Sequence, residues 1–268
     1  MTERRLRRWQ KDAVGAVLSA LQDGSSPVVW AVMGAGKSIA IAELARIAAD
    51  KGRAVIISVP TQQLVRQQAA AVEFWTQQIC GQWYADVKEL RAVTVVCQDS
   101  LPTLPRELQP DLPDQLKADG ALWIADEAHK TECDTVHDWY ASRDDIRFKV
   151  GFTATPWRAD ASESLRLFDQ LAYSYTAADA YAQGHIVKPV LHWPSEPGDL
   201  DTLTVDWVAR QHGPGVVNAR TIDDAMHIEA KLMARGIACR MAHSRMDRES
   251  IESGLKWLRD SEKPLRAM

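Results

Sequence analysis

The chain has 268 residues, of which 46% are hydrophobic and 25% are charged, which is typical of a globular protein with one full core and part of another. No apolar run approaches the ~20 residues that cross a bilayer, and the basic start MTERRLRRWQ is not followed by the apolar stretch of a signal peptide, so the sequence predicts a cytoplasmic protein without membrane partners. The formal net charge of −4 does not exclude a nucleic-acid partner, because contact can be confined to one groove.

A phosphate-binding loop is predicted near the start of the chain. The apolar run at 28–32 indicates a buried strand, and the pattern over 38–50 has apolar residues at helical spacing and stops at Lys51-Gly52. Glycines in the connection let backbone N–H groups crowd around a phosphate, toward which the following helix points its positive end. The residues of this loop are Met33, Gly34, Ala35, Gly36, Lys37 and Ser38.

Two side chains give the loop its chemistry. Lys37 is a point charge for the β- and γ-phosphates of a nucleotide, and the Ser38 hydroxyl is suited to be a Mg²⁺ ligand. Ala31 stands where the usual pattern has Gly. A turn that only packs tightly is the alternative interpretation, and the Lys-Ser pair in phase with a preceding strand argues against it.

A pair of acids follows a second apolar run, at 121–125. Such a run predicts a strand whose carboxyl end carries Asp126 and Glu127, and open α/β sheets bind ligands at that edge. We expect Asp126 to hold Mg²⁺, Glu127 to orient and deprotonate the water that attacks the γ-phosphate, and His129 to sense the phosphate. Alone, two acids after a strand are usually a solvated loop or a helix cap, so this interpretation depends on the phosphate loop.

With these two motifs the chain resembles superfamily 2 helicases and translocases, most closely the DEAH-type group that includes motor subunits of type I and type III restriction enzymes and phage helicases. The resemblance covers nearly the whole sequence and implies ATP and Mg²⁺ as cofactors. Residues 6–10, LRRWQ, are similar to the N-terminal motif of the family, which implies that Gln10 reads the adenine edge. The basic cluster around this motif is interpreted either as a backbone or nucleotide contact or as a solvated tail; it comprises Arg4, Arg5, Arg7 and Arg8.

Three further short motifs occur in the family's order. The segment after a strand predicted at 54–59 is similar to motif Ia, which touches the nucleic-acid backbone, and the segment after a strand at 93–97 resembles the next such contact. The residues implied are Pro60, Thr61, Gln62, Gln98 and Ser100. GFTATP at 151–156 resembles motif III, in which Thr153 and Thr155 link the hydrolysis site to the nucleic-acid groove. Trp157, next in the chain, is interpreted as a packing residue or a base-stacking one.

The order of these elements predicts the fold class. Strand candidates, the last at 148–152, alternate with helix candidates that include 38–50 and a Gln- and Ala-rich stretch at 62–78. This alternation predicts an α/β protein with a mostly parallel sheet and helices on both faces, and the resemblance implies that the sheet is RecA-like. Four prolines within 102–116 indicate an irregular surface excursion before the acid-bearing strand.

A Pro/Gly/acid stretch at 194–201 predicts a domain boundary, with an ATP-binding domain at 1–196, a linker at 197–204 and part of a second RecA-like domain at 205–268. The expected elements of the second domain are a strand at 215–220, a helix at 222–235, a strand at 237–242 and a helix at 247–259. In this part Arg220 and Ser244 fall where the family touches the nucleic-acid backbone, and surface polar residues at strand ends are the alternative.

The sequence therefore predicts an ATP-dependent helicase or translocase in which ATP draws two domains together and hydrolysis lets them part, with DNA favoured over RNA by family analogy. Motifs V and VI are absent, so we expect slow turnover unless a partner chain provides arginine fingers. A catalytically idle nucleic-acid-binding subunit and a P-loop NTPase that does not act on nucleic acid stay open as alternatives.

The cysteines form no C-x-x-C pair, which argues against a zinc site; they are Cys80, Cys97, Cys133 and Cys239.

Overall fold

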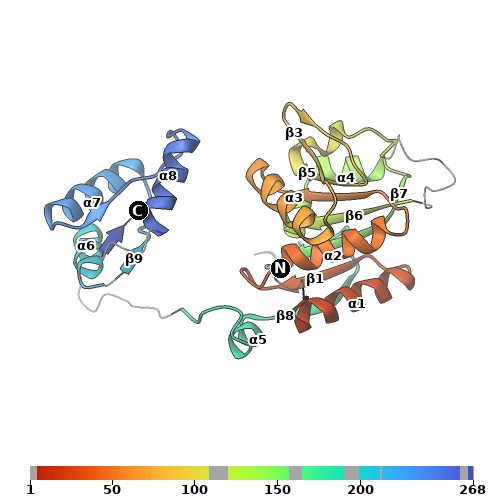
Figure 1. Ribbon diagram of the computed structural model, residues 1–268, viewed down its shortest axis with the longest axis horizontal. Helices are drawn as coiled ribbons and strands as arrows, with labels where there is room; N and C mark the ends of the chain where they lie inside the picture. The colour runs from red at the N-terminus through yellow and green to blue at the C-terminus, as the bar shows by residue number, and fades with distance from the viewer. Residues whose placement is uncertain are drawn as a thin grey trace. The chain divides into compact units, whose positions relative to one another are not determined.

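The computed structural model describes residues 5–108, 120–156, 165–189, 199–211, 213–259 and 265–267. The chain divides into two compact units, which we call the first unit, Met1–Lys188, and the second unit, Pro189–Met268 (Figure 1). Among the described residues, no helix has the length and apolar character needed to span a membrane.

The first unit is built on one eight-stranded sheet in the order β4-β3-β5-β2-β6-β7-β1-β8. All neighbouring strands are parallel except β3 and β4, which form an antiparallel hairpin at one edge. The strands are β1 Pro27–Ala31, β2 Val55–Val59, β3 Gly81–Tyr84, β4 Val87–Lys88, β5 Val93–Cys97, β6 Ala121–Asp126, β7 Ile146–Thr153 and β8 Gln170–Tyr175.

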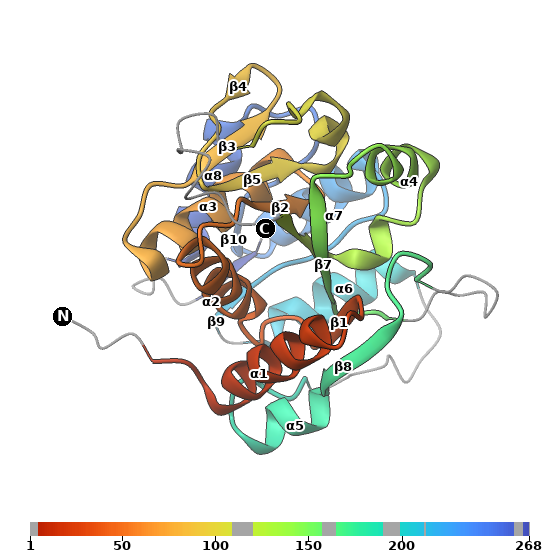
Figure 2. The same cartoon turned by 90° about the vertical axis from the view of Figure 1, so that its right-hand side faces the viewer.

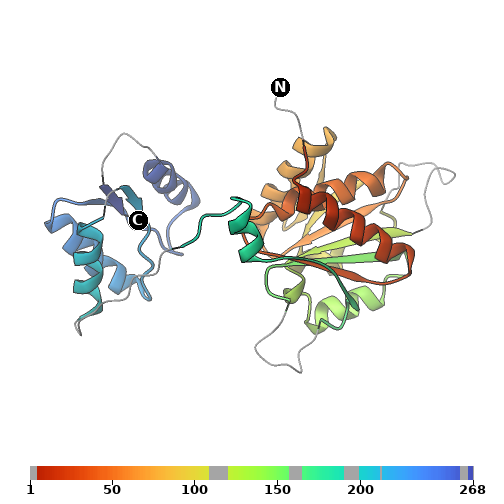
Figure 3. The ribbon, with the colours of Figure 1, turned by 90° about the horizontal axis from the view of Figure 1, so that it is seen from below.

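Helices cover both faces of this sheet. They are α1 Arg8–Gln22, α2 Lys37–Ala49, α3 Gln62–Thr76, α4 Asp134–Ala141 and α5 Ala177–Ala182, with short 3₁₀ turns η1 Gln98–Thr103 and η3 Ala128–Lys130. Figures 2 and 3 show α1 and α2 on one side of the sheet and α4 on the other. The predicted α/β fold with a mostly parallel, RecA-like sheet is confirmed.

Burial on both faces explains why the central strands are apolar at consecutive positions. In β2, Ile57 belongs to the core under α1, α2 and α3, whereas Ile56 belongs to the core under α4 and η1. In β6, Ile124 and Trp123 divide in the same way, because successive side chains of a strand point to opposite faces. This alternation fixes which residues reach each layer of helices.

The strands expected at 54–59, 93–97, 121–125 and 148–152 and the helices expected at 38–50 and 62–78 are all present, with ends shifted by no more than two residues. The short strands β3 and β4 and the edge strand β8 were not predicted. Of these, β8 has the sequence QLAYSY and only its last residue is buried, so it lacks the apolar run that marks the central strands. The excursion predicted at 102–116 begins within η1, and residues 109–119 lie outside the described part.

The second unit has three short parallel strands in the order β10-β11-β9, at Ala238–Cys239, Leu265–Ala267 and Gly213–Gly215. Its helices are α6 Leu200–Ala209, α7 Ile222–Ala234 and α8 Arg248–Arg259. Its core comprises Val205, Val208, Ile228, Leu232, Ile237 and Cys239. The helices expected at 222–235 and 247–259 are present, and the strand expected at 237–242 is reduced to β10. The strand expected at 215–220 is wrong, because β9 ends at Gly215 and residues 216–220 form no strand.

The linker expected at 197–204 needs a correction. Asp199 caps a helix there by accepting a hydrogen bond from the Thr202 backbone N–H at 3.0 Å. The apolar face of that helix, α6, packs against α7 through Val205 and Val208. Residues 200–204 are therefore helical, and the two units divide after Lys188 rather than after residue 196. The Pro, Gly and acidic residues at 194–201 are typical of a linker, so the sequence did not indicate that a helix begins at Leu200.

Candidate nucleotide site at the carboxyl edge of the sheet

The predicted motifs meet at one edge of the first unit because they follow parallel strands. Trp30 of β1 is paired with Thr153 of β7, and Asp126 of β6 is paired with Phe152 of the same β7. In this register the phosphate loop, the acid pair and motif III leave the sheet side by side. Ligands of open α/β sheets bind at the carboxyl edge of the strands, so the three motifs lie where a ligand is expected.

The phosphate loop has the backbone that its glycines predict. Gly34 has φ 79° and Gly36 has φ 96°, both in the left-handed region. Gly36 is the N-cap of α2, and no side chain caps that end of the helix. The first N–H groups of α2 therefore face the loop as donors, which together with the helix dipole makes an anion site.

The N-terminal segment braces this loop from the side. Arg7 donates from Nη1 to the carbonyl of Ala35 at 2.8 Å, and Gln10 donates from Nε2 to the carbonyl of Gly36 at 2.9 Å. The Gln10 Oε1 accepts from the backbone N–H of Arg7 at 2.7 Å. Only 3% of Gln10 is exposed, so it is a buried support of the loop. One amide N–H and one lone pair stay available for adenine, and that role of Gln10 stays a prediction.

The acid pair lies opposite the loop lysine. Lys37 Nζ is 3.8 Å from Glu127 Oε1 and donates to the carbonyl of Ala31 at 3.3 Å. The Ser38 carbonyl accepts from Gln68 Nε2 of α3 at 3.2 Å, which ties the first turn of α2 to its neighbour. This places the ammonium between the strand that carries the loop and the strand that carries the acids.

Asp126 sits in an environment that disfavours its charge. Burial, and next the adjacent Glu127 carboxylate, raise the pKa of Asp126 to about 6, whereas Lys37 and the Glu127 backbone N–H lower it. That N–H donates to Asp126 Oδ1 at 3.1 Å. Glu127 itself has φ 54°, an uncommon conformation for a residue with a side chain and one found mostly at functional positions. A nearby cation would relieve the repulsion between the two carboxylates.

The site chemistry fits Mg²⁺ bound together with a nucleotide. Carboxylate and hydroxyl oxygens, such as those of Asp126 and Ser38, are the ligands that Mg²⁺ prefers, and it usually takes one or two of them plus phosphates and water. Among the described residues, no group of three or more His, Cys, Asp or Glu side chains could hold a metal by itself. Phosphate oxygens would therefore complete the coordination, and the assignment of Asp126 and Ser38 stays a prediction.

His129 joins the acid pair to motif III. Its Nδ1 lies 3.4 Å from Glu127 Oε2, 2.9 Å from Thr153 Oγ1 and 3.2 Å from Thr155 Oγ1. Thr153 is fully buried, and its Oγ1 also accepts from the Thr155 backbone N–H at 3.0 Å. The structure brings these predicted residues together around one imidazole nitrogen, so a movement of Glu127 or His129 changes the contacts of motif III.

The predicted nucleic-acid contacts of the first unit lie on the next two strands. Val59 of β2 is paired with Cys97 of β5, so 60–62 and 98–100 leave the sheet together. Thr61 caps α3 by accepting from the Leu64 backbone N–H at 3.3 Å, and Gln98 Nε2 donates to the Lys130 carbonyl at 2.7 Å. Pro60, Gln62 and Ser100 are partly or fully exposed beside them, whereas Trp157 lies outside the described residues.

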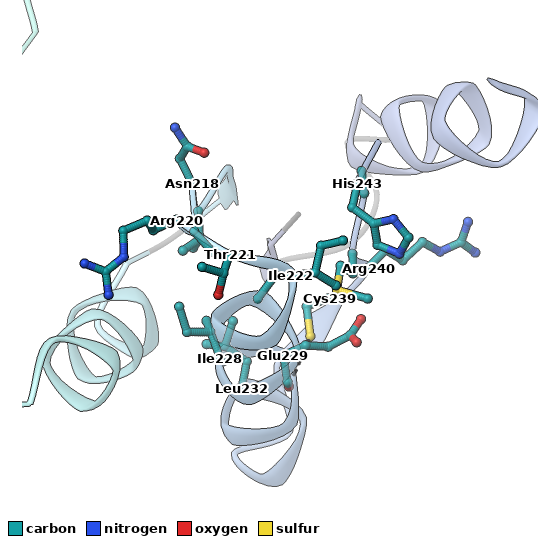
Figure 4. Close-up of a pocket in the computed structure, with 15 residues that line it drawn as sticks. Asn218, Arg220, Thr221, Ile222, Ile228, Glu229, Leu232, Cys239, Arg240 and His243 are labelled. Atoms are coloured by element: carbon teal, nitrogen blue, oxygen red, sulfur yellow. Dashed lines mark hydrogen bonds between the residues drawn. The ribbon is translucent and has the colours of Figure 1, made fainter. Parts of the chain in front are cut away.

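The remaining predicted contacts belong to the second unit, beside a cavity of about 250 Å³ (Figure 4). Figure 4 shows Arg220 and Arg240 on opposite sides of this cavity, with His243 on the β10 side. The Arg220 side chain is 91% exposed, with Nε 3.8 Å from Asp224 Oδ2. Ser244 is exposed in the turn that follows His243.

Sequence reasoning missed several residues that shape the nucleotide site. The Trp9 ring stacks on Tyr175 with 4.9 Å between centroids, and the Tyr175 hydroxyl lies 2.6 Å from His185 Nδ1. Ile186, next in the chain, is the nearest side chain to Gly34, 3.5 Å from where a Cβ would stand. Tyr175 ends β8, and His185 and Ile186 follow it; these three residues belong to no short motif, so no sequence signal marked them. The sequence allowed Arg7 to be either a backbone or nucleotide contact or part of a solvated tail. In the structure its side chain donates to the phosphate loop.

Comparison with known proteins identifies the family. Residues 3–158, more than half of the chain, match the family model described as "Type III restriction enzyme, res subunit". The chain belongs to this family. Its first unit is accordingly a superfamily 2 helicase-like motor domain, as the resemblance implied. No curated protein gives a significant sequence match.

Solved structures of such motors share the fold. The Type ISP restriction-modification enzyme LlaBIII bound to DNA matches with TM-score 0.69 and 15% identity over 99% of this chain, which spans 24% of the LlaBIII chain. S. cerevisiae Dbp5 bound to RNA and ADP BeF3 matches with TM-score 0.59 and 15% identity, over 97% of this chain and 69% of Dbp5. The UvsW helicase of bacteriophage T4 matches with TM-score 0.50 and 19% identity, over 65% of this chain and 62% of UvsW. At these identities the likeness concerns the fold.

Proposed function

We propose that this chain is an ATP-dependent motor that couples hydrolysis of Mg-ATP to movement along a nucleic-acid strand, with DNA as the track. The observation that carries this proposal is that one imidazole nitrogen, His129 Nδ1, lies 3.4 Å from Glu127 Oε2 and 2.9 Å from Thr153 Oγ1. A phosphate-binding enzyme without a track has no need to place its general base and a buried threonine of motif III around one imidazole. The restriction-enzyme family supports DNA over RNA.

Each residue of the site has one role in the proposed reaction. Lys37 and the N–H groups at the start of α2 hold the phosphates, while Ser38 and Asp126 hold Mg²⁺ directly or through water. Glu127 accepts the proton of the attacking water, for which its carboxylate must be ionised at neutral pH. His129 then reports loss of the γ-phosphate to Thr153 and Thr155 of motif III.

Glu127→Gln tests the chemical half of this proposal. The amide cannot accept a proton, so single-turnover hydrolysis is expected to fall by about 10²-fold or more, while affinity for a non-hydrolysable ATP analogue stays close to that of the wild type. Glu89→Gln, in the exposed turn after β4, is the matched control. If Glu127→Gln hydrolyses ATP as fast as the wild type does, Glu127 is not the group that accepts the proton of the attacking water.

A binding titration tests the nucleic-acid half. Filter binding of single-stranded DNA and of RNA of the same sequence, at low salt and with the ATP analogue, is expected to show tighter binding of DNA. Low salt strengthens phosphate contacts, so that even a weakly bound nucleic acid is detected under these conditions. If neither nucleic acid binds, the P-loop NTPase without a track is the better description; if RNA binds more tightly, the choice of DNA is wrong.

A further inference from the structure

Gln98, the first residue of η1 after β5, reaches the turn that follows the acid pair. The strands β5 and β6 are not neighbours in the sheet, because β2 lies between them. Gln98 Nε2 nevertheless donates to the Lys130 carbonyl at 2.7 Å. Lys130 is the last residue of η3, the turn that begins directly after Glu127. The Gln98 side chain therefore bridges the predicted nucleic-acid contacts and the predicted hydrolysis site.

The bridge continues from Lys130 to the main chain of Glu127. The Lys130 backbone N–H donates to the Glu127 carbonyl at 2.8 Å, and the Glu127 backbone N–H donates to Asp126 Oδ1 at 3.1 Å. These bonds hold the backbone on both sides of a residue whose φ of 54° is unfavourable for a side chain. Two hydrogen bonds in series thus connect the Gln98 amide with the backbone of the predicted general base.

The turn between these bonds is short and closed by further contacts. The Ala128 carbonyl accepts from the Thr131 backbone N–H at 3.0 Å and from Thr131 Oγ1 at 2.8 Å. Ala128 is fully buried and Thr131 is 1% exposed. Because the turn is packed on this side, the Lys130 carbonyl and the Glu127 backbone move together.

The Gln98 amide has hydrogen-bonding groups to spare. A carboxamide has two N–H donors and an acceptor oxygen, and within the described part of the chain the Gln98 side chain makes only the bond to Lys130. The second N–H can donate to a phosphate oxygen of a nucleic-acid strand while the first stays on Lys130. A partly exposed side chain loses rotamer freedom to make one bond, so a second partner that needs the same rotamer stabilises the first bond.

Other glutamines show how a static support differs from this bond. Gln10 and Gln68 also donate to backbone carbonyls near the phosphate loop, and each is only 3% exposed. Gln98 is only partly buried, and its bond to Lys130 is open to solvent. Water competes for such a bond, so it contributes little stability by itself. It suits a contact that is completed when a ligand binds.

We propose that Gln98 is a positioning residue through which a bound nucleic-acid strand accelerates hydrolysis. The strand fixes the Gln98 amide on the Lys130 carbonyl, and Lys130 then holds Glu127 in the geometry that activates water. This regulation rests on the motor function proposed above and adds a route that does not pass through motif III. A misplacement of about 1 Å can cost about 10²-fold in rate, so a small displacement of Glu127 is enough.

Two variants of matched length test the proposal. Gln98→Met places a methyl group where the amide nitrogen stands, whereas Gln98→His keeps a ring N–H at the same number of bonds from the backbone. Single-turnover hydrolysis by the full chain is measured with and without saturating single-stranded DNA, at pH 8, where imidazole is neutral. The stimulation factor is the rate with DNA divided by the rate without it. It is expected to fall about fivefold or more in Gln98→Met and to recover to at least about half of the wild-type value in Gln98→His.

The kinetic form of the loss separates positioning from nucleotide binding. The maximal rate with DNA should fall in Gln98→Met, while the protein concentration that gives half of this rate changes by less than about twofold. Gln67→Met is the matched control, because it makes the same change at an exposed position of α3. Its stimulation factor should stay within about twofold of the wild-type value.

Amide hydrogen exchange provides a readout that needs no turnover. With the ATP analogue bound, exchange of the Lys130 N–H reports how stably it is bonded to the Glu127 carbonyl. DNA is expected to slow this exchange by about threefold or more in the wild type and to leave it nearly unchanged in Gln98→Met. Equal slowing in both proteins would contradict the route through Gln98.

The outcomes distinguish this inference from the motor function itself. An undiminished stimulation factor in Gln98→Met, an equal loss in Gln67→Met, or no recovery in Gln98→His would each overturn the inference and leave the motor function standing. A wild type whose hydrolysis does not respond to DNA would overturn the proposed motor function, and this inference with it.

Discussion

At the scale of single residues, the acid pair at the end of β6 combines an energetic cost with a chemical use. Asp126 is partly buried beside a second carboxylate, and Glu127 has a left-handed backbone. Such a conformation costs on the order of 1 kcal/mol for a residue with a side chain. Packing around β6 must therefore stabilise an arrangement that is unfavourable by itself and favourable once Mg²⁺ is bound.

Asp126→Asn is expected to stabilise the nucleotide-free protein at neutral pH by on the order of 2 kcal/mol. The folded-state pKa is raised from 3.8 to about 6. As pH rises from about 4 to 6, the unfolded chain releases this proton before the folded one does, so the wild type loses stability across that window. Urea unfolding at pH 4 and pH 7.5, without Mg²⁺, should show the variant's advantage only at the higher pH.

The exposed Asp86, in the turn between β3 and β4, provides the control for this experiment. Asp86→Asn makes the same chemical change away from the acid pair, and its unfolding midpoint should follow the wild type at both pH values. An equal gain for Asp126→Asn at pH 4 and pH 7.5 would contradict the environment that we describe for this carboxyl group.

At the scale of elements, the N-terminal segment and α1 act on a loop about 28 residues further along the chain. Arg7 and Gln10 bind consecutive carbonyls of the phosphate loop, at Ala35 and Gly36. Both bonds hold the backbone of the loop at the start of α2, whose first N–H groups no side chain caps. The segment thereby positions the loop without contributing a ligand to the metal.

Arg7→Ala is expected to weaken binding of a non-hydrolysable ATP analogue by about 5- to 30-fold, equivalent to ~1–2 kcal/mol. The variant loses the charge-assisted bond to Ala35 but keeps the backbone N–H that Gln10 accepts. Isothermal titration calorimetry measures the change. Arg8→Ala is the matched control, because the Arg8 side chain is 91% exposed and lies 3.8 Å from Asp12. Equal weakening in both variants would mean that only net charge matters.

At the scale of the whole molecule, the chain consists of two units with separate cores. The first unit holds the complete sheet and the described residues of the nucleotide site, from Arg7 to Ile186. The second unit has its own core around α6 and α7, including the pair of Lys231 Nζ and Asp199 Oδ2 at 3.2 Å. Nucleotide binding and the proposed backbone contacts at Arg220 and Ser244 are thus assigned to different units.

A chain that ends at Lys188 is therefore expected to unfold cooperatively and to bind the ATP analogue within about twofold of the full chain. Its affinity for DNA should fall, because the phosphate contacts proposed for the second unit are lost. The slope of log K against log salt concentration should become less steep by about one to two. Calorimetry and anisotropy at several salt concentrations measure both effects. Loss of analogue binding would show that the second unit takes part in the nucleotide site.

The sequence by itself determined the features that are local. A phosphate loop needs its glycines, lysine and serine within six positions, and a central strand with helices on both faces needs an unbroken apolar run, so both are visible without a structure. The parallel sheet then follows from the alternation of strands and helices, and the roles proposed for Lys37, Asp126 and Glu127 follow from the phosphate-loop pattern and from the place of the two acids at a strand end.

Only the tertiary structure decided which distant residues meet. The contact of Arg7 with Ala35, the bond between His129 and Thr153, and the stacking of Trp9 on Tyr175 depend on strand order and on where β8 pairs. A pocket beside the ends of α1 and α2 likewise combines side chains from α1, α2, β6 and β7. Such contacts are set by packing between elements far apart in the chain, and the periodicity of one segment carries no information about the partner that it will face.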